Sequence, residues 1–346
     1  MFSSIPGVAE GLGHLPDVAL DVITDPALGG YGGTVTFAAD ALAPATLARL
    51  AEAEVLIAEP AVVASLLRHD GACLRGLRWC QSTYAGVDAL FATGASGTVP
   101  PRQPRRRPSW VLTRFAGCFG PPIAEWCLAR IVGHERSFAA TATDQAGRGW
   151  ASSRAQVTAY RYLSTLTLTV LGCGDIGRRV AGAASALGMR TVGYGRKERS
   201  ARDAGVDEYT QDLAKALRAG DYVVSVLPST PETRGLLSGE ALAPAAKANG
   251  GKGPVLLNVG RGDVISEASI ISSLDRGYLS AAILDVFETE PLPSDSPLWD
   301  RPDVIVSPHV SALTQASDVP RVFLDNYERY VEGKDLKYVV DWDKGY

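Results

Sequence analysis

Short apolar runs alternate with stretches of helical periodicity along most of the chain, which is typical of an α/β protein with parallel sheets. The apolar runs predict strands, and the stretches between them predict the connecting helices. The expected strands are 18–23, 55–58, 77–81, 166–171, 190–194, 222–227, 255–259, 281–286 and 304–306. The expected helices are 42–53, 61–68, 178–187 and a long helix that begins at Gly120. This pattern predicts at least one parallel sheet of five or more strands.

Length and composition narrow the class of protein. The 346 residues suggest two domains, at about 150 residues per domain. The 46% of hydrophobic and 21% of charged residues exclude wholesale disorder. A net charge of −4 argues against a general nucleic-acid binder, and the spacing of Cys and His predicts no metal site. No apolar run is long enough to span a bilayer and the first residues lack a secretion signal, so we expect a cytoplasmic protein without membrane partners.

A stretch rich in Pro, Gly and Arg at 93–108 interrupts the alternating pattern. It predicts an exposed loop. Its arginines leave open a contact with an anionic partner, although a solvated loop is the simpler interpretation.

The clearest motif is GCGDIG at 172–177, which matches GxGxxG. Alone the string is weak, but here it follows an apolar strand and precedes a helix, as in dinucleotide-binding sites. The first glycine permits a tight turn, the second lets the backbone approach a pyrophosphate, and the third lets helix and strand pack closely. A glycine turn that binds nothing is the alternative. The cofactor residues expected from this motif are Gly172, Gly174, Asp175, Ile176 and Gly177.

The end of the next strand indicates which dinucleotide is bound. NAD sites usually place an acidic residue there, which binds the ribose 2′-OH. Residues 194–197 read YGRK, and no carboxylate occurs before Glu198. Gly195 leaves space for a 2′-phosphate, and Arg196 and Lys197 can pair with it. The sequence therefore favours NADP(H), with NAD(H) still possible; two solvated charges at a strand end are the simpler alternative.

Three later segments place polar side chains just beyond predicted strands. NVGRG brings Arg261, DVFETEP brings Asp285 and Glu290, and SPHVS brings His309. Ligands of doubly wound sheets bind beyond the carboxyl ends of the strands. We therefore expect Arg261, Glu290 and His309 to converge where a nicotinamide would lie, although each alone has a simpler explanation as a surface or loop residue.

From about residue 77 onward the chain resembles the D-isomer-specific 2-hydroxyacid dehydrogenases, and within them most the glyoxylate/hydroxypyruvate reductases. The resemblance rests on a series of motifs in the family's order: STYAGVD (82–88), GCFGPPIAEW (117–126), GCGDIG, LPSTPETRGL (227–236), NVGRG (258–262), DVFETEPLP (285–293), SPLW (296–299), SPH (307–309) and VVDWDKGY (339–346). It implies two doubly wound α/β domains around a cleft. Residues 1–117 and 313–346 would form a flavodoxin-like substrate domain, and residues 118–312 a Rossmann dinucleotide-binding domain. Family members are usually homodimers, and Trp150 lies where some reductases contribute a tryptophan to the neighbouring subunit.

The resemblance also implies roles for individual residues. His309 would be the general acid/base, Glu290 would pair with its imidazole, and Arg261 would hold the substrate carboxylate. Backbone N–H groups would complete the substrate site, whose expected residues are Ala85, Gly86 and Arg261. Asp285 would bind the nicotinamide carboxamide. The cofactor contacts expected beyond the glycine-rich turn and the YGRK segment are Leu227, Pro228, Thr233, Val259, Asp285 and His309.

These features predict an NADPH-dependent reductase of small 2-oxo acids such as glyoxylate or hydroxypyruvate. Two alternatives stay open. One is a nucleotide-sensing protein similar to the corepressors of the family, which keep much of the same constellation. The other is an NAD-dependent enzyme similar to the D-3-phosphoglycerate dehydrogenases.

Overall fold

The computed structural model describes residues 1–13, 20–28, 38–69, 71–91, 108–150, 152–248, 252–343 and 345. The chain forms two compact units, Met1–Cys118 with Thr314–Tyr346, and Phe119–Leu313. The assignment of one unit to the substrate and the other to the cofactor stays a prediction. Apart from its last residue, the predicted loop at 93–108 lies outside the described residues.

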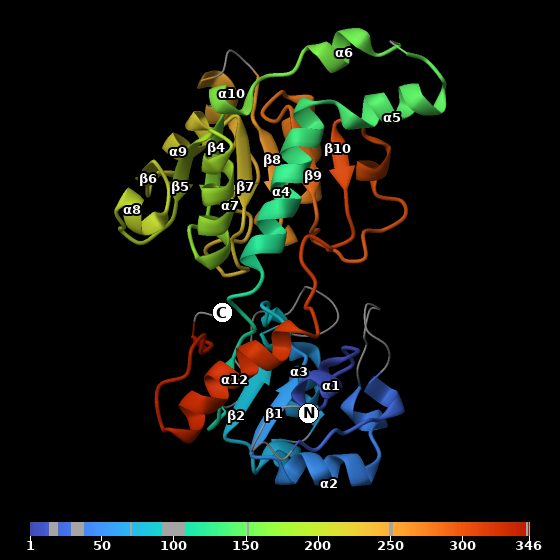
Figure 1. The fold of residues 1–346 in the computed structure, drawn as a ribbon, viewed down its shortest axis with the longest axis vertical. Coiled ribbons are helices and arrows are strands. Elements are labelled where there is room, and N and C mark those ends of the chain that lie inside the picture. Colours follow the sequence, from blue (N-terminus) through green and yellow to red (C-terminus); the bar gives the residue numbers. More distant parts are fainter. Residues whose placement is uncertain are drawn as a thin grey trace. The chain divides into compact units, whose positions relative to one another are not determined.

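The unit Phe119–Leu313 is built on a seven-stranded parallel sheet (Figure 1). Its strands are β4 (Thr167–Leu171), β5 (Arg190–Tyr194), β6 (Glu208–Thr210), β7 (Tyr222–Ser225), β8 (Val255–Asn258), β9 (Ala281–Leu284) and β10 (Val304–Val306). They lie in the order β10-β9-β8-β7-β4-β5-β6. β4 pairs with both β5 and β7, so the strand order reverses at this point. In doubly wound sheets this reversal opens the crevice that binds ligands.

Helices cover both faces of this sheet. They are α4 (Gly120–Glu135), α7 (Asp175–Ala186), α8 (Ala201–Ala204), α9 (Leu213–Ala219), α10 (Ala243–Ala248) and α11 (Glu267–Asp275). Two further helices, α5 (Phe138–Ala146) and α6 (Arg154–Thr158), extend away from the sheet and bury no residue (Figure 1). α4 and α7 pack against each other in front of the strands (Figure 1). α9, α10 and α11 contribute to an apolar core with Leu171 of β4 and Leu256 of β8. The strands β7, β8 and β9 are buried along their whole length, as expected for parallel strands with helices on both faces of the sheet.

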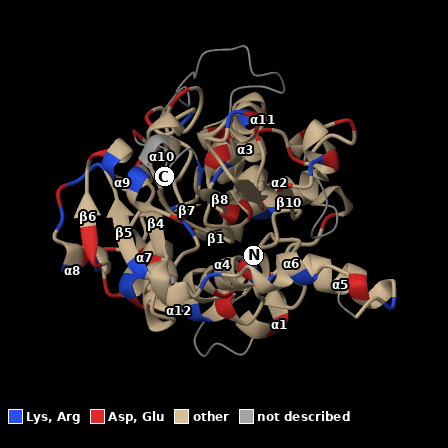
Figure 2. Cartoon of the chain, turned by 90° about the horizontal axis from the view of Figure 1, so that it is seen from above, with Lys and Arg blue, Asp and Glu red and all other residues tan. Residues whose placement is uncertain are grey.

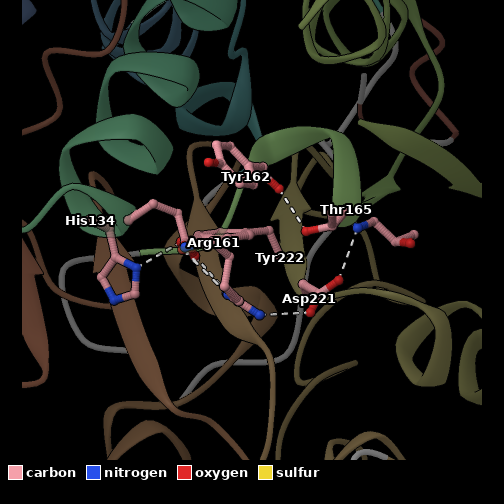
Figure 3. Close-up of polar contacts among 8 residues, drawn as sticks. His134, Arg161, Tyr162, Thr165, Asp221 and Tyr222 are labelled. Carbon is pink, nitrogen blue, oxygen red and sulfur yellow. Dashed lines mark hydrogen bonds and ion pairs between the residues drawn. The ribbon is translucent and has the colours of Figure 1, made fainter. Parts of the chain in front are cut away.

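A polar network that includes the buried side chains of Glu135 and Tyr222 lies at the amino end of this sheet, where β7 begins (Figure 3). The Tyr222 hydroxyl donates to Glu135 at 2.6 Å and lies 2.7 Å from Nδ1 of His134. Arg161 donates to Glu135 at 2.6 Å and to Asp221 at 2.8 Å. Burial lowers the pKa of His134 and raises that of Tyr222. Burial alone would raise the pKa of Glu135, but its hydrogen bonds from Arg161 and Tyr222 hold it below its ordinary value.

The other unit contains a three-stranded parallel sheet in the order β1 (Val55–Ala58), β2 (Trp79–Ser82), β3 (Val111–Thr113). Its helices are α1 (Val8–Leu12), α2 (Pro44–Glu52), α3 (Pro60–His69) and α12 (Asp318–Val331). Val339 forms an antiparallel bridge to Thr113, so the end of the chain extends this sheet. The Trp79 ring stacks on Phe323 of α12, with 5.3 Å between the ring centroids.

The predicted α/β fold class is confirmed. The strand predicted at 18–23 is wrong over its described part, because residues 20–23 form no strand. Phe2 instead bridges to Ala58 of β1, and Ile23 only donates its N–H to the Met1 carbonyl. α7 begins at Asp175, three residues before the predicted start, since the glycine-rich turn leads directly into the helix. Within the described residues, none of the helices is long and apolar enough to cross a bilayer.

Candidate active site

The carboxyl ends of parallel strands share one edge of a sheet, and most of the predicted site residues follow those ends. They are Gly172 and Gly174 after β4, Arg196 and Lys197 after β5, Leu227 and Pro228 after β7, Val259 and Arg261 after β8, Asp285 and Glu290 after β9, and His309 after β10. Asp175, Ile176 and Gly177 form the first turn of α7. Ala85 and Gly86 follow β2 in the other unit, where both are half-buried.

His309 and Glu290 form a hydrogen-bonded pair at this edge. Nδ1 of His309 lies 2.8 Å from Oε2 of Glu290. An ionised carboxylate only accepts hydrogen bonds, so Nδ1 carries the hydrogen and Nε2 is left for proton exchange with a ligand. The two side chains are 49% and 36% exposed, respectively, which makes them accessible to a small molecule.

The backbone of His309 is left-handed, with φ at +53°. This conformation is uncommon for a residue other than glycine and costs on the order of 1–3 kcal/mol. Two hydrogen bonds support it, from the His309 N–H to the carbonyls of Asp285 at 2.9 Å and Ser307 at 3.1 Å. Such strain concentrates at functional sites, where the surrounding structure holds one residue in a required position.

The carboxylate of Asp285 is fully buried and binds the segment around His309. One of its oxygens accepts from the Ser307 hydroxyl at 2.6 Å and from the Val310 N–H at 3.0 Å. The other accepts from the Ser311 N–H at 2.8 Å. Three of its roughly four acceptor positions are therefore used to position the histidine loop. Its expected contact with the nicotinamide carboxamide stays a prediction.

The charges of Arg261 and His309 both act on Glu290. Partial burial alone would raise the pKa of Glu290. The hydrogen bonds from His309 and from the Phe287 N–H, together with the charges of His309 and Arg261, instead hold this pKa below its ordinary value. Glu290 is therefore ionised at neutral pH, and Arg261 lies close enough to the pair to influence it.

The glycine-rich turn fits a dinucleotide pyrophosphate. A side chain at Gly177 would lie 2.0 Å from the Gly172 carbonyl oxygen, so only glycine lets α7 pack this closely on the turn. A Cβ added at Gly174 would meet no atom within 4 Å, which leaves open space beside the first N–H groups of α7. Burial raises the pKa of the Cys173 thiol to about 11, so the turn adds no negative charge that would repel phosphates.

Cations follow β5, as the NADP(H) prediction requires, but they have partners that sequence reasoning missed. Arg196 forms an ion pair of 3.0 Å with Glu232, which lies in the loop after β7. Arg199 donates to the Cys173 carbonyl at 2.9 Å and so links this segment to the glycine-rich turn. Neither contact has a signal in the sequence, because the partners lie 26 or more residues apart and meet only through the strand order.

The loop after β7 is held by its own hydrogen bonds. The Thr233 hydroxyl donates to the Pro228 carbonyl at 2.6 Å, and the Thr230 N–H donates to Thr233. Leu227 and Val259 are almost fully buried beside the strand ends. These residues therefore lie at the carboxyl edge of the sheet, and their contacts with a cofactor stay predictions.

Comparison with known proteins decides the family. A sequence profile described as "D-isomer specific 2-hydroxyacid dehydrogenase, NAD binding domain" matches residues 128–311. This span is more than half of the chain and contains the glycine-rich turn, Arg261, Glu290 and His309. The chain belongs to the D-isomer specific 2-hydroxyacid dehydrogenase family. The residues that match this NAD binding domain all lie within the unit Phe119–Leu313.

Similar members of the 2-hydroxyacid dehydrogenase family are known from several bacteria. Glyoxylate/hydroxypyruvate reductase A of Salmonella paratyphi B is 31% identical over 179 residues, which are 51% of this chain and 55% of the relative. The match thus spans about half the length of such curated relatives.

Solved structures of the family match more of the chain. A D-isomer specific 2-hydroxyacid dehydrogenase family protein from Aeromonas salmonicida is 36% identical, with a TM-score of 0.70, over 86% of this chain and 88% of that one. An NADPH-dependent glyoxylate/hydroxypyruvate reductase from Sinorhizobium meliloti, solved with NADP and sulfate, is 28% identical, with a TM-score of 0.69, over 85% and 88%. The family's fold therefore extends to both units of this chain.

Proposed function

We propose that this family member uses NADPH to reduce a small 2-oxo acid to a D-2-hydroxy acid. The observation that carries the proposal is the His309–Glu290 pair at 2.8 Å, which lies at the same sheet edge as the glycine-rich turn and within range of the Arg261 charge. Together these groups can hold a carboxylate and exchange a proton with a neighbouring carbonyl oxygen.

The nicotinamide cofactor supplies the hydride when bound, and the residues of this chain do the remaining work. The Arg261 guanidinium binds the carboxylate of the substrate and orients its carbonyl. Nε2 of His309 holds a proton and delivers it to the carbonyl oxygen. The ionised Glu290 stabilises the protonated imidazole that must be present before this transfer. Backbone N–H groups at Ala85 and Gly86 are proposed to bind the carboxylate as well.

The proposed substrate class follows from the guanidinium. Its planar fork suits a carboxylate next to a carbonyl, whereas an aldehyde or a simple ketone lacks the group that Arg261 would bind. The Salmonella and Sinorhizobium relatives are named for glyoxylate and hydroxypyruvate, and we propose these acids as the first candidates.

The proposed preference for NADPH over NADH rests on the end of β5. Arg196 and Lys197 follow this strand, and Gly195 stands where an NAD site has an acid. The Sinorhizobium relative was solved with NADP. We expect Arg196→Ala combined with Lys197→Ala to raise the Kd for NADPH far more than the Kd for NADH, which titration calorimetry would measure. Equal effects on both cofactors would contradict the preference.

We also propose a cytoplasmic homodimer that does not bind nucleic acid. The α5–α6 region exposes apolar surface, with Trp150 99% and Phe138 56% exposed, as a subunit contact would require. Basic and acidic positions are interspersed along the described residues (Figure 2), which is unlike a phosphate-binding surface. Sedimentation of the wild type and of Trp150→Ser would test the dimer, and a monomeric wild type would contradict it.

The activity is tested with purified protein, both reduced nicotinamides and a panel of 2-oxo acids, by following the absorbance of the reduced nicotinamide. We expect oxidation of NADPH with glyoxylate or hydroxypyruvate and little with glycolaldehyde, which lacks the carboxylate. Dinucleotide binding without turnover on any acid would instead support the nucleotide-sensing alternative. Absence of both binding and turnover would exclude both functions.

A further inference from the structure

Gly195, at the end of β5, is covered by the side chain of Tyr209 from the neighbouring strand β6. A Cβ at position 195 would lie 2.5 Å from the Tyr209 hydroxyl oxygen, closer than real Cβ contacts occur. The next atom of the ring, Cζ, would be 3.5 Å away, which is an ordinary contact. Any side chain at this position would therefore force the hydroxyl to move.

The Tyr209 hydroxyl is held where it is. It donates a hydrogen bond of 2.7 Å to the Lys197 carbonyl, and burial raises its pKa, so it stays protonated and able to donate. A Cβ at Gly193 would lie 3.1 Å from Cδ2 of the Tyr209 ring, so the ring is closely packed on β5. Moving the hydroxyl away from Gly195 would therefore break the bond to Lys197 and disturb this packing.

A second side chain that follows β6 holds the same segment. Nε2 of Gln211 donates to the Arg196 carbonyl at 2.5 Å. The carbonyls of both Arg196 and Lys197 thus bind side chains at the β6 end, while Arg199 binds the glycine-rich turn. The backbone that carries the two cations is fixed from both sides.

We propose that Tyr209 determines the cofactor specificity of this protein, as a positioning residue that acts through Gly195 and Lys197. Its hydroxyl keeps an acidic side chain out of the position that would bind a ribose 2′-OH, and it fixes the segment that presents Arg196 and Lys197 to a 2′-phosphate. This inference deepens the proposed function and rests on its NADPH preference.

The inference predicts that the two positions depend on each other. Gly195→Asp alone should lower the Tm of the free protein and weaken both cofactors, with no gain in NADH binding, because the carboxylate has no room. Tyr209→Phe removes only the hydroxyl and should raise the Kd for NADPH about two- to tenfold, the range expected for one lost hydrogen bond. In the double variant the Tm should recover, and NADH should bind at least about tenfold more tightly than to Gly195→Asp.

The experiment measures the Tm without cofactor, and the Kd of NADPH and of NADH by titration calorimetry, for the wild type and the three variants. Gly182→Asp is the control for an added carboxylate, because a Cβ at this exposed position of α7 meets no atom within 4 Å. Tyr278→Phe is the control for a lost hydroxyl, since Tyr278 binds Glu240 at a distant site. Neither control should change the ratio of the two dissociation constants.

The outcomes separate the inference from the function on which it rests. Tight NADH binding by Gly195→Asp at an unchanged Tm would overturn the role of Tyr209, while a wild type that prefers NADPH would leave the proposed function standing. A double variant that behaves like Gly195→Asp would overturn the role as well. A wild type that binds both cofactors equally, or neither, would overturn the proposed cofactor preference and the inference together.

Discussion

The unit Phe119–Leu313 contains two histidine–carboxylate groups at opposite edges of one sheet, which differ in the burial of the carboxylate and in the backbone conformation of the histidine. At the amino edge, Glu135 is 8% exposed and the Tyr222 hydroxyl connects it to His134. At the carboxyl edge, Glu290 and His309 are far more exposed, and the histidine backbone is left-handed. The carboxylate at the amino edge is therefore buried, whereas both side chains of the pair at the carboxyl edge are accessible to solvent.

The hydrogen bonds define the tautomer of each histidine. Tyr222 gives its one hydrogen to Glu135, so His134 must donate Nδ1–H to the tyrosine oxygen. His309 uses only Nδ1 for Glu290, which leaves Nε2 for a ligand. Both histidines thus use Nδ1, and the difference between them is one of position: His309 follows β10 at the edge that carries the glycine-rich turn, whereas His134 lies at the opposite edge.

The largest difference is expected in kcat when each histidine is replaced in turn. His309→Asn should lower kcat by about 10²–10⁴-fold, the usual contribution of general acid catalysis. Asparagine is chosen because it tolerates the left-handed backbone at this position. His134→Asn should keep a rate close to that of the wild type. Steady-state assays of both variants would check this, and similar losses in the two would abolish the distinction.

Replacing the two carboxylates should likewise affect activity at one edge and stability at the other. Glu290→Gln should lower kcat/KM by roughly 10- to 100-fold, as expected from about 1.5–3 kcal/mol for a charged hydrogen bond. Because its pKa lies below the ordinary value, Glu290 is ionised across neutral pH, so the loss should persist from about pH 6 to about pH 8. The matched variant Glu135→Gln should lower the Tm and leave kcat/KM unchanged. A Glu290 variant that loses only stability would contradict this assignment.

Tyr222→Phe should affect stability alone. It removes the hydroxyl that joins Glu135 to His134 and should lower the free energy of unfolding by about 1–3 kcal/mol, since buried polar atoms lose a partner. Urea denaturation would measure the change. Tyr162→Phe, at a side chain that is 69% exposed, is the control and should change little. A fall in kcat at unchanged stability would link the amino edge to catalysis.

The smallest expected effect is on the pH dependence of stability. His134 has a lowered pKa in the folded protein, so the unfolded chain takes up its proton first as the pH falls. Its contribution is complete above the ordinary value of 6.5 and declines as the pH falls towards the lowered pKa. His134→Asn should remove this part of the decline, and His309→Asn should retain it. Urea denaturation at several pH values would show the difference, and identical profiles would contradict it.

The sequence predicted the elements whose signal is local. β4 is a run of apolar and β-branched residues followed by three glycines in a fixed pattern, so both the strand and the turn are recognisable without the structure. β3 and β6 were not expected, because β3 begins at an exposed residue close after the stretch rich in Pro and Arg, and β6 is half-buried, with a charged residue at its start. Their pairing depends on neighbouring strands that the local pattern does not contain.

Some residues of the candidate site also have a local sequence signal, and others have none. Arg261, Glu290 and His309 stand out because each follows a predicted strand in a recognisable motif, and their catalytic roles stay predictions. The partners of these residues have no such signal. Asp285 binds three groups around His309, and Tyr209 covers Gly195, through contacts that only the register and order of the strands create.

The smaller unit is assembled from the two ends of the chain, with residues 314–346 returning to residues 1–118. Trp79 has its stacking partner Phe323 almost 250 positions later, and Leu112 accepts a hydrogen bond from the Val340 N–H. During synthesis on the ribosome, residues 1–118 therefore lack their packing partners, and part of their apolar surface stays exposed, until the whole intervening unit has been translated. A nascent chain arrested before residue 314 should for this reason bind chaperones through its first hundred residues. The chaperones should dissociate only when α12 has emerged and covers this surface.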